Sequence, residues 1–456
     1  RLLKQSNEVV IATDADREGE TIARSVMELH NYSGSVKRLW LSALDEASIK
    51  KALNSILPGS KTKPLYDSGK ARQRADWLMG MNLTRAYTCI AKKHGGNSVL
   101  SVGRVQSPTL AMIVKRDREI ANFKPKDHFS LEAFINVENG TFKATWQPDK
   151  SICDPDGHVV EKSLVQTIKQ KCSDKTGHTT DAKTERKKEQ APLPYSLSTL
   201  QQDASNILGF PAAKTLKVAQ SLYETHKITS YPRTDCHYLP MSQHSEASLI
   251  VNRVYSVDPE IASLAKQADT SMVSRAFNDK KITAHHAIIP TQTPPELSKM
   301  KSDEKALYDL IRRRYLAQFF PAFEYDQTKI SCDIQGEVFT ASGRTTRIEG
   351  WKDVIKNHSE GKKKSEPEQM LPAVTLHEPA HCQTLNLVNK QTKPPQHFTD
   401  ATLISAMTNI GRDITDPKLK KILKETSGLG TEATRAGIID TLLQRSFIIR
   451  KAKKLL

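Results

Sequence analysis

The chain has 456 residues, of which 38% are hydrophobic and 26% charged, a composition typical of a globular protein with about two to four domains. Its 68 basic and 51 acidic residues give a formal charge of +17, which favours a polyanionic partner such as nucleic acid over a surface of solvated lysines. No apolar run approaches the roughly 20 residues that span a bilayer, and six scattered cysteines form no CxxC pair. We therefore expect a cytoplasmic protein with reduced thiols, without a membrane segment, zinc ribbon or disulfide framework.

The first 56 residues predict a β/α unit built around an acidic turn. Residues 9–12 are typical of a short apolar strand, "TDADREGE" of a turn and residues 21–29 of an amphipathic helix. A second strand is expected in "KRLWLSAL" (37–44), followed by a helix from about residue 45 to 56. Because the chain starts without methionine, opens almost directly into this unit and ends in "FIIRKAKKLL", we expect a segment of a longer polypeptide.

The rest of the chain alternates between helical and β-type blocks. Short alternating segments, typical of antiparallel strands, fill residues 122–183 and 324–388. The polar stretch "NHSEGKKKSEPEQ" (357–369) predicts a flexible loop in the second of these blocks. Mainly helical patterns occupy residues 66–117, 191–321 and 398–456. This order indicates that the chain leaves a β domain, forms a helical domain and returns.

The motif "DADRE" places three carboxylates, Asp14, Asp16 and Glu18, at every second position after a strand. In a loop that bends into a helix, carboxylates at this spacing can converge on a hard cation such as Mg²⁺. The alternative is a solvated acidic turn whose carboxylates are favoured by the positive end of the helix dipole.

The motif "SYPRTD" combines Tyr231, Pro232 and Arg233. A phenol is a weak nucleophile at neutral pH unless a nearby cation stabilises the phenolate, and the guanidinium of Arg233 can do this while also holding a phosphate oxygen. Pro232 restricts the backbone of Tyr231 to extended geometry. The alternative is a half-buried tyrosine that ends a strand before a turn.

The stretch "ITAHHAIIPT" (282–291) contains adjacent histidines in apolar surroundings. Their spacing does not suit a zinc pair on one helix face, which requires positions i and i+4. We expect one of them to donate to a phosphate oxygen and the other to be structural, although either is equally consistent with a satisfied core histidine.

Two further stretches, "SVGRVQSPT" (101–109) and "GLGTEATRAG" (428–437), place glycine, hydroxyl groups and arginine before a helix. Helix N-termini of this kind bind phosphate through backbone N–H groups. Each is equally consistent with an ordinary capped helix start, with Ser107 before Pro108 in the first and Thr431 or Thr434 near the N-cap in the second.

Together the five features suit phosphodiester chemistry on nucleic acid. In this combination and order the chain resembles the type IA DNA topoisomerases, most closely bacterial topoisomerase III, over nearly its whole length. The stretches that carry the resemblance are "DADREGE", "LSALDEASIKKAL", "RADWLMGMNLTRAYT", "LSVGRVQSPTL", "LYETHKITSYPRTD", "AHHAIIPT" and "GLGTEATRAGIIDTLLQR".

The resemblance implies an α/β multidomain fold with toroidal architecture. A partial TOPRIM domain is expected at residues 1–55, and the helical domain III that carries the tyrosine at 191–321. Two other domains would each be split in sequence: helical domain IV into 56–122 and an incomplete 398–456, and β-rich domain II into 123–190 and 322–397.

The resemblance also implies a reaction. Tyr231 would attack a backbone phosphorus of single-stranded DNA, which gives a 5′-phosphotyrosyl link and a free 3′-OH. Another strand passes through the gate, and the 3′-OH reseals the break without ATP. Arg233 matches the arginine that contacts the scissile phosphate, His285 matches the histidine that hydrogen-bonds it, and Asp235 is expected to orient one of these two.

Mg²⁺ is the implied cofactor, with Asp14, Asp16 and Glu18 as its acids. The family's single-strand groove implies a set of DNA-binding residues: Arg72, Asp76, Arg104, Gln106, Ser107, Thr434 and Arg435. Residues 410–424 resemble the insertion associated with decatenation. Expected partners of this monomer are single-stranded and negatively supercoiled DNA, a RecQ-type helicase and a single-strand binding protein.

One departure from the family pattern leaves an alternative open. The family's first TOPRIM strand carries a glutamate and is followed by a lysine, and both would lie upstream of Arg1. The chain would then be a catalytically impaired fragment that only binds single-stranded DNA. A primase or nuclease with a TOPRIM domain does not explain "SYPRTD" with "AHHAIIPT", and a tyrosine recombinase is disfavoured because HxxR is missing near the histidines.

Overall fold

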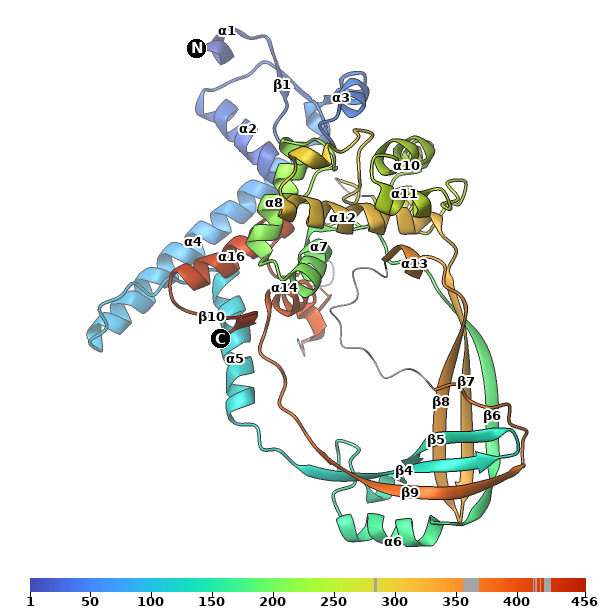
Figure 1. Ribbon diagram of the computed structural model, residues 1–456. Helices are drawn as coiled ribbons and strands as arrows, with labels where there is room; N and C mark the ends of the chain where they lie inside the picture. The colour runs from blue at the N-terminus through green and yellow to red at the C-terminus, as the bar shows by residue number, and fades with distance from the viewer. Residues whose placement is uncertain (283–284, 356–368, 413, 415, 419, 422–427) are drawn as a thin grey trace. The chain divides into compact units, whose positions relative to one another are not determined.

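The computed structural model describes residues 1–282, 285–355, 369–412, 414, 416–418, 420–421 and 428–456. The chain forms two compact units, which are described separately (Figure 1). Unit 1 comprises residues 1–117, 192–320 and 397–456, and unit 2 comprises residues 118–191 and 321–396. A toroidal shape would depend on how the units sit together, and it stays a prediction. Residues 357–368 of the predicted loop lie outside the described residues.

The antiparallel strands of unit 2 close into a barrel with the strand order β4-β5-β8-β7-β6-β9. Four of the pairings join the two separate stretches of chain that make up the unit: β4 with β9, β5 with β8, β6 with β7 and β6 with β9. The strands are β4 (Asp127–Val137), β5 (Gly140–Gln147), β6 (Thr176–Glu189), β7 (Phe323–Ile334), β8 (Glu337–Ile348) and β9 (Pro379–Gln391).

Alternation of apolar and polar residues along these strands builds the core of the barrel. Ile135 on β4, Trp146 on β5 and Phe339 on β8 are at most 1% exposed. Helix α6 (Lys162–Cys172) contributes Val165 to the same core. Because burying a large apolar side chain stabilises a fold by about 1.5–3 kcal/mol, these positions dominate the stability of the barrel.

The N-terminal part of unit 1 is a small β/α sheet. Strand β1 (Glu8–Ile11) runs parallel to β2 (Ser35–Arg38), and β3 (Leu57–Pro58) pairs antiparallel to β2. Helix α2 (Arg17–Leu29) connects β1 to β2, and α3 (Glu46–Leu53) follows.

The second strand of this sheet is shorter than the stretch 37–44 that the sequence predicts, because β2 ends at Arg38. The Leu39 N–H still donates to the Ile11 carbonyl, at 2.9 Å, but the chain then leaves the sheet. The Ser42 carbonyl accepts instead from the backbone N–H of Tyr231. Residues just after β2 are therefore used to hold the tyrosine segment.

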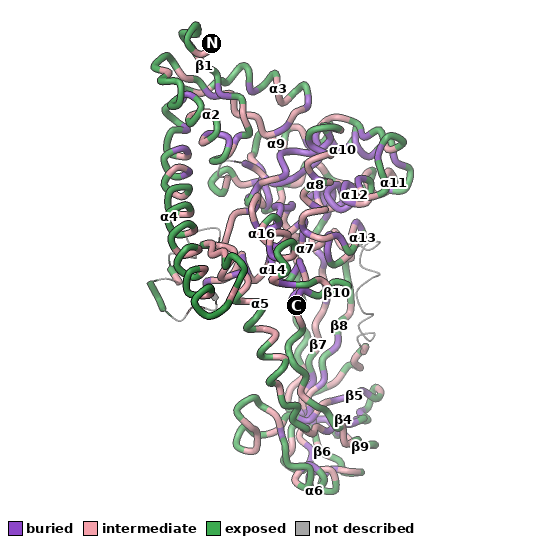
Figure 2. Tube along the Cα trace, turned by 90° about the vertical axis from the view of Figure 1, so that its left-hand side faces the viewer, coloured by how far each residue is buried: buried purple, intermediate pink, exposed green. Residues whose placement is uncertain are grey.

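Helices make up most of the remainder of unit 1. In Figure 2, α8 (Ala212–Glu224) and α12 (Ser302–Leu316) carry much buried surface, whereas the long α4 (Lys63–Lys93) is largely exposed. Other helices are α5 (Gln106–Ala121), α7 (Leu197–Asp203), α9 (Met241–His244), α10 (Ala247–Tyr255), α11 (Pro259–Ala265), α14 (Asp400–Thr408) and α16 (Glu432–Gln444). No helix within the described part of the chain is both long and apolar enough to span a membrane.

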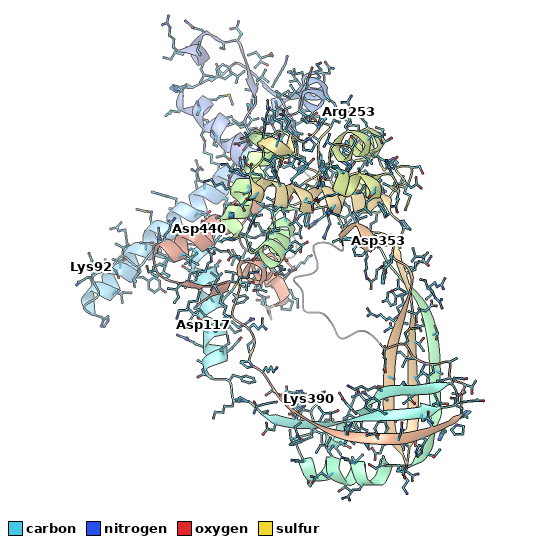
Figure 3. The ribbon with its side chains drawn as sticks, viewed as in Figure 1. Lys92, Asp117, Arg253, Asp353, Lys390 and Asp440 are labelled. Carbon is cyan, nitrogen blue, oxygen red and sulfur yellow. The ribbon has the colours of Figure 1, made fainter. Side chains whose placement is uncertain are left out.

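A second apolar core joins α5, α14 and α16. It contains Ile113, Leu403 and Ile439, each at most 1% exposed. Asp117, labelled on α5 in Figure 3, lies 2.9 Å from Nδ1 of His397, where the chain re-enters unit 1. The first and last stretches of unit 1 are thus fixed to each other.

The prediction of helix over 398–456 is wrong at its C-terminal end. There β10 (Arg450–Lys451) and β11 (Lys454–Leu455) form an antiparallel pair. The Leu455 N–H also donates to the Phe398 carbonyl, at 2.7 Å. This backbone bond, together with burial of Leu455 in the second core, favours a short extended pair over another helical turn.

Two phenylalanines of the barrel provide a matched test of its core. Phe339→Ala removes a fully buried ring and should lower the free energy of unfolding by about 3–5 kcal/mol. Phe134→Ala removes a ring that is 40% exposed and should cost less than about 1 kcal/mol. Urea unfolding of the full chain, followed by circular dichroism, measures both. Equal losses would contradict the assigned core.

Candidate active site

The acidic motif forms a tight turn at the start of α2. Asp16 is the N-cap residue, and its carboxylate accepts a hydrogen bond from the Gly19 N–H at 2.7 Å. The Asp16 N–H in turn donates to the Asp14 carbonyl at 2.8 Å. A Cβ on residue 19 would lie 2.1 Å from the Asp14 carbonyl oxygen. Only glycine lets the helix approach the turn this closely.

A buried ion pair supports this turn from below. Arg38 and Glu20 are both fully buried, and Arg38 Nε lies 2.9 Å from Glu20 Oε1. The other nitrogens of the guanidinium donate, at 2.6–3.0 Å, to three backbone carbonyls around the turn, those of Ile11, Thr13 and Asp14. Arg38 therefore fixes the path of the backbone that presents the two aspartates.

The segment around Tyr231 is held by backbone hydrogen bonds on both sides. The Tyr231 N–H donates to the Ser42 carbonyl at 2.8 Å, and the Ser230 N–H donates to the Ile289 carbonyl at 2.9 Å. The Ser230 hydroxyl accepts from the Ile289 N–H, also at 2.9 Å. These bonds fix the backbone that carries the Tyr231 side chain.

The Tyr231 hydroxyl meets the acidic turn. It donates to Asp16 Oδ2 at 2.8 Å and lies 3.3 Å from Asp14 Oδ2. Burial, reinforced by the two carboxylates, raises the pKa of Tyr231 far above its ordinary value. Burial, together with Asp16, also raises the pKa of Asp14. Residues more than 200 positions apart in the sequence thus form one polar cluster.

His285 packs beside this cluster. It is 6% exposed, and its ring centroid lies 4.6 Å from that of Tyr231. Burial lowers the pKa of His285 to about 4, so the ring is neutral at physiological pH. Neither ring nitrogen has a hydrogen-bond partner among the described residues, so one donor and one acceptor remain for a ligand. The adjacent His286 contacts the Ala287 carbonyl at 2.8 Å, which fits the structural role expected for one of the pair.

A cleft of about 560 Å³ opens above these groups within unit 1. Arg233 contributes to its lining, and its Nη1 lies 4.0 Å from Glu18 Oε2. Eight residues predicted from the sequence line it: Asp16, Glu18, Arg72, Asp76, Arg233, Asp235, His285 and Thr434. Sequence reasoning missed other lining residues, among them Arg17, Gln73 and Glu432.

Two of the predicted groove arginines share one carboxylate. Arg104 pairs with both oxygens of Asp76, at 2.6 and 3.3 Å, and Arg72 Nε lies 3.8 Å from the same carboxylate. Asp76 therefore aligns two guanidinium groups along α4, where they can bind phosphate oxygens.

Four of the predicted groove residues do not line the cleft: Arg104, Gln106, Ser107 and Arg435. Gln106 Oε1 accepts from Arg445 at 3.3 Å, and the Ser107 hydroxyl accepts from the Gly103 N–H at 3.1 Å. Helix α5 already begins at Gln106, so Ser107 is not a cap before the helix.

Arg435 differs most from its prediction. It is fully buried, pairs with Glu432 at 2.5 Å and donates to the Ser198 hydroxyl at 2.8 Å. It also donates to the Leu429 and Gly430 carbonyls, at 3.1 and 3.2 Å. Its position does not support DNA binding, because the guanidinium is used to stabilise the turn before α16. Of the stretch 410–424, residues 413, 415, 419 and 422–424 lie outside the described residues, so the decatenation assignment stays a prediction.

The three acids predicted to bind metal do not converge on one point. Asp14 and Asp16 face the Tyr231 hydroxyl, whereas Glu18 faces Arg233. The oxygen donors nevertheless suit Mg²⁺. Burial, and after it the neighbouring Asp16, raises the pKa of Asp14, and a cation between the two carboxylates would offset their repulsion.

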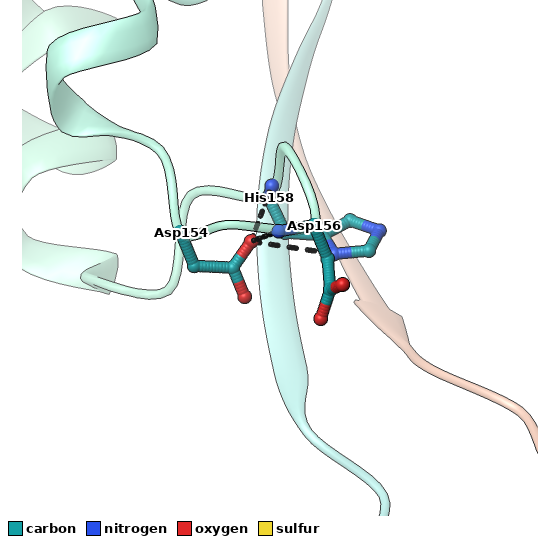
Figure 4. Close-up of side chains that lie close together, drawn as sticks. All are labelled: Asp154, Asp156 and His158. Atoms are coloured by element: carbon teal, nitrogen blue, oxygen red, sulfur yellow. Dashed lines mark hydrogen bonds and ion pairs between the residues drawn. The ribbon is translucent and has the colours of Figure 1, made fainter. Parts of the chain in front are cut away.

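Among the described residues, a group of three potential metal ligands lies in unit 2, away from the acidic turn (Figure 4). The ligand atoms of Asp154, Asp156 and His158 lie within 4.8 Å of one another. Asp154 Oδ1 accepts from the backbone N–H of Asp156 at 3.0 Å and of His158 at 2.8 Å. The turn's own hydrogen bonds therefore explain why these side chains lie close together.

The buried ion pair below the acidic turn can be tested against an exposed ion pair that also uses a glutamate. Glu20→Gln replaces the negatively charged partner of buried Arg38 with a neutral amide. We therefore expect a loss of about 3–5 kcal/mol in the free energy of unfolding. Glu46→Gln breaks the exposed pair with Lys50, which lies one helical turn away, and should cost less than about 0.5 kcal/mol. Chemical denaturation of both variants makes the comparison, and equal effects would show that Arg38 does not depend on Glu20.

Comparison with known proteins identifies the family of the chain. Residues 60–456 match the family model described as "DNA topoisomerase", and residues 1–44 match the Toprim domain. DNA topoisomerase 3 of Vibrio cholerae is 41% identical over 99% of this chain and 71% of its own length. The enzyme of the same name from Haemophilus influenzae is 41% identical over 100% of this chain and 72% of its own length.

A solved structure shares the fold. Full-length topoisomerase I from Thermotoga maritima matches with a TM-score of 0.72 and 24% identity, over 100% of this chain and 69% of that one. The predicted α/β multidomain fold is thereby confirmed. The two family models and the relatives at 41% identity agree with this fold in assigning the chain to the DNA topoisomerases. The chain belongs to the type IA DNA topoisomerases, which bind single-stranded DNA, cleave one strand and pass another through the break.

Proposed function

We propose that Tyr231 is the nucleophile of this topoisomerase and that the cleft above it receives the scissile phosphate. The observation that carries the proposal is the hydrogen bond from the Tyr231 hydroxyl to Asp16, beside a neutral histidine and an arginine that line the same cleft. A nucleophile, a proton acceptor and groups for phosphate oxygens are thus within one site.

The reaction exchanges one phosphoester for another. The Tyr231 Oη–P bond forms and the P–O3′ bond breaks, the phenolic proton passes to a carboxylate of the acidic turn, and the 3′ oxygen takes up a proton. Arg233 stabilises the charge on the phosphate and the phenolate. His285 donates its N–H to a phosphate oxygen, and Asp235 orients the groups at the rim. Because the number of phosphoester bonds is unchanged, ATP is not needed.

Members of this family generally depend on Mg²⁺, and we assign Asp14 and Asp16 as its principal ligands, with Glu18 as a third. The ion supplies positive charge that offsets the carboxylates and the phosphate. Independently of the ion, Asp16 holds the hydroxyl of Tyr231 and caps α2.

Arg72, Arg104 and Thr434 are proposed to follow the DNA backbone away from the site, with Asp76 aligning the two arginines. Gln106 and Ser107 would contact DNA only outside the described cleft. A DNA substrate implies a cytoplasmic, DNA-associated monomer, and a RecQ-type helicase and a single-strand binding protein are its proposed partners.

A second candidate function is binding of single-stranded DNA without cleavage. The observation that favours it is the buried hydroxyl of Tyr231, because a phenol with a strongly raised pKa is a poor nucleophile until a ligand changes its surroundings. Formation of a covalent adduct separates the two functions.

Tyr231→Phe should abolish the covalent adduct with a single-stranded oligonucleotide while leaving its affinity within about twofold, because only the nucleophilic oxygen is lost. Denaturing gels detect the adduct, and fluorescence anisotropy measures the affinity. Tyr223→Phe is the matched control, since Tyr223 is also buried and its ring lies edge-on to Tyr231 at 5.5 Å. An adduct that persists in Tyr231→Phe would refute the assignment, and a wild-type chain that binds DNA without forming one would support the second candidate.

The metal assignment can be tested with Mn²⁺ as a probe for Mg²⁺. Removing both carboxylates with Asp14→Asn and Asp16→Asn should weaken Mn²⁺ binding by more than about tenfold. Loss of a group that only hydrogen-bonds a metal ligand already lowers metal affinity by about 10–100-fold. The electron paramagnetic resonance signal of free Mn²⁺ reports the bound fraction. Asp154→Asn with Asp156→Asn is the control in unit 2 and should leave most of the binding intact. The reverse pattern would move the metal site to unit 2.

A further inference from the structure

Trp40 lies between the support of the acidic turn and His285. Its ring centroid is 5.8 Å from that of His285, with an angle of 25° between the ring planes, so the two rings are stacked. On the indole ring, the guanidinium carbon of Arg38 lies 5.0 Å from the centroid. His285 in turn packs on Tyr231. Arg38, Trp40, His285 and Tyr231 therefore form a continuous series of contacts.

The orientation of His285 depends on these rings. No hydrogen bond to either of its nitrogens exists among the described residues. A ligating or phosphate-binding histidine usually has one nitrogen fixed by a carbonyl or carboxylate, which sets the direction of the other. Here the described contacts of the imidazole are with the rings of Trp40 and Tyr231, so stacking must do what a hydrogen bond does elsewhere.

Arg38 connects these stacked rings to the acidic turn. The same guanidinium that holds the carbonyls of the acidic turn also supports the face of Trp40. A displacement of the turn would thus move the indole, and with it the imidazole. The buried side chain of Arg38 therefore fixes both the carboxylates beside Tyr231 and, through Trp40, the histidine proposed to bind phosphate.

We propose that Trp40 is a positioning residue, which holds the neutral imidazole of His285 in the direction needed to reach the scissile phosphate beside Tyr231. This inference rests on the proposed function, in which His285 donates to that phosphate. Trp40 itself touches neither substrate nor reacting atoms in this role.

The test compares two substitutions of Trp40 in the full chain. Trp40→Leu removes the aromatic face and should slow single-turnover cleavage of a single-stranded oligonucleotide by about tenfold or more. The reason is that a small displacement of a group that acts on the phosphate strongly lowers the reaction rate. Its affinity for the oligonucleotide should stay within about twofold of wild type, because no DNA contact is removed. Trp40→Phe restores an aromatic face and should recover most of the rate. Trp351→Leu, which removes another half-buried indole in unit 2, should not alter cleavage.

A spectroscopic measurement tests the contact without any cleavage. In a chain labelled with ¹³C at histidine Cε1, the resonance of His285 is identified by its loss in His285→Gln. Trp40→Leu should shift this resonance while leaving most other histidine resonances in place, and Trp40→Phe should shift it less. An unchanged resonance in Trp40→Leu, or a shift of all histidines together, would overturn the proposal.

The outcomes separate the two claims. If wild type forms the adduct and Trp40→Leu cleaves at the wild-type rate, the positioning role is wrong while Tyr231 remains the nucleophile. If wild type forms no adduct, the proposed function fails, and the positioning role fails with it even where the resonance shifts.

Discussion

The buried ion pair between Arg38 and Glu20 is the constraint on which the rest of the site depends. Two charges without exposure to water are costly unless all their hydrogen-bonding groups find partners. Arg38 offsets much of this cost by its ion pair with Glu20 and by donating to carbonyls of the acidic turn, and Glu20 also pairs with Arg24 at 2.8 Å. The conformation of the turn is therefore set by the need to satisfy a buried guanidinium. The positions of Asp14 and Asp16 follow from it.

If Tyr231 is the nucleophile, as proposed, its surroundings keep it unreactive in the absence of a substrate. Tyr231 is 2% exposed, so burial raises its pKa, and the carboxylates that its hydroxyl faces raise the pKa further. Arg233 opposes that effect, but its Nη1 is 4.0 Å from Glu18 and its Nε has no hydrogen-bond partner among the described residues. A phosphate in the cleft would give Arg233 and His285 the partner they lack. Reactivity would then depend on bound DNA.

Much of this could be predicted from the sequence, and the limits have physical causes. The short motifs singled out Tyr231, the aspartates and His285, which the structure brings together, although their catalytic roles stay a proposal. The alternation of apolar residues predicted the strands of unit 2, but the closure of the barrel depends on pairings between distant segments that periodicity does not encode. The role of Arg38 was missed because, apart from Glu20, its partners are backbone carbonyls, which leave no trace in the sequence. Arg435 was misjudged for the opposite reason: an arginine beside glycines and threonines resembles a phosphate site, and only burial shows that its partners are internal.

The pairing of β4 with β9 has a consequence for how the chain folds. Glu132 pairs with Asn386, so the barrel cannot close until a ribosome has made nearly the whole of the described chain. Residues 192–320, which belong to unit 1, are synthesised between the two halves of the barrel. Pairings of such high sequence separation close slowly, because the loop entropy must be lost before the contacts form. During synthesis the first half of the barrel therefore exposes unpaired strand edges, which makes it the part of the nascent protein with the greatest need of protection from aggregation.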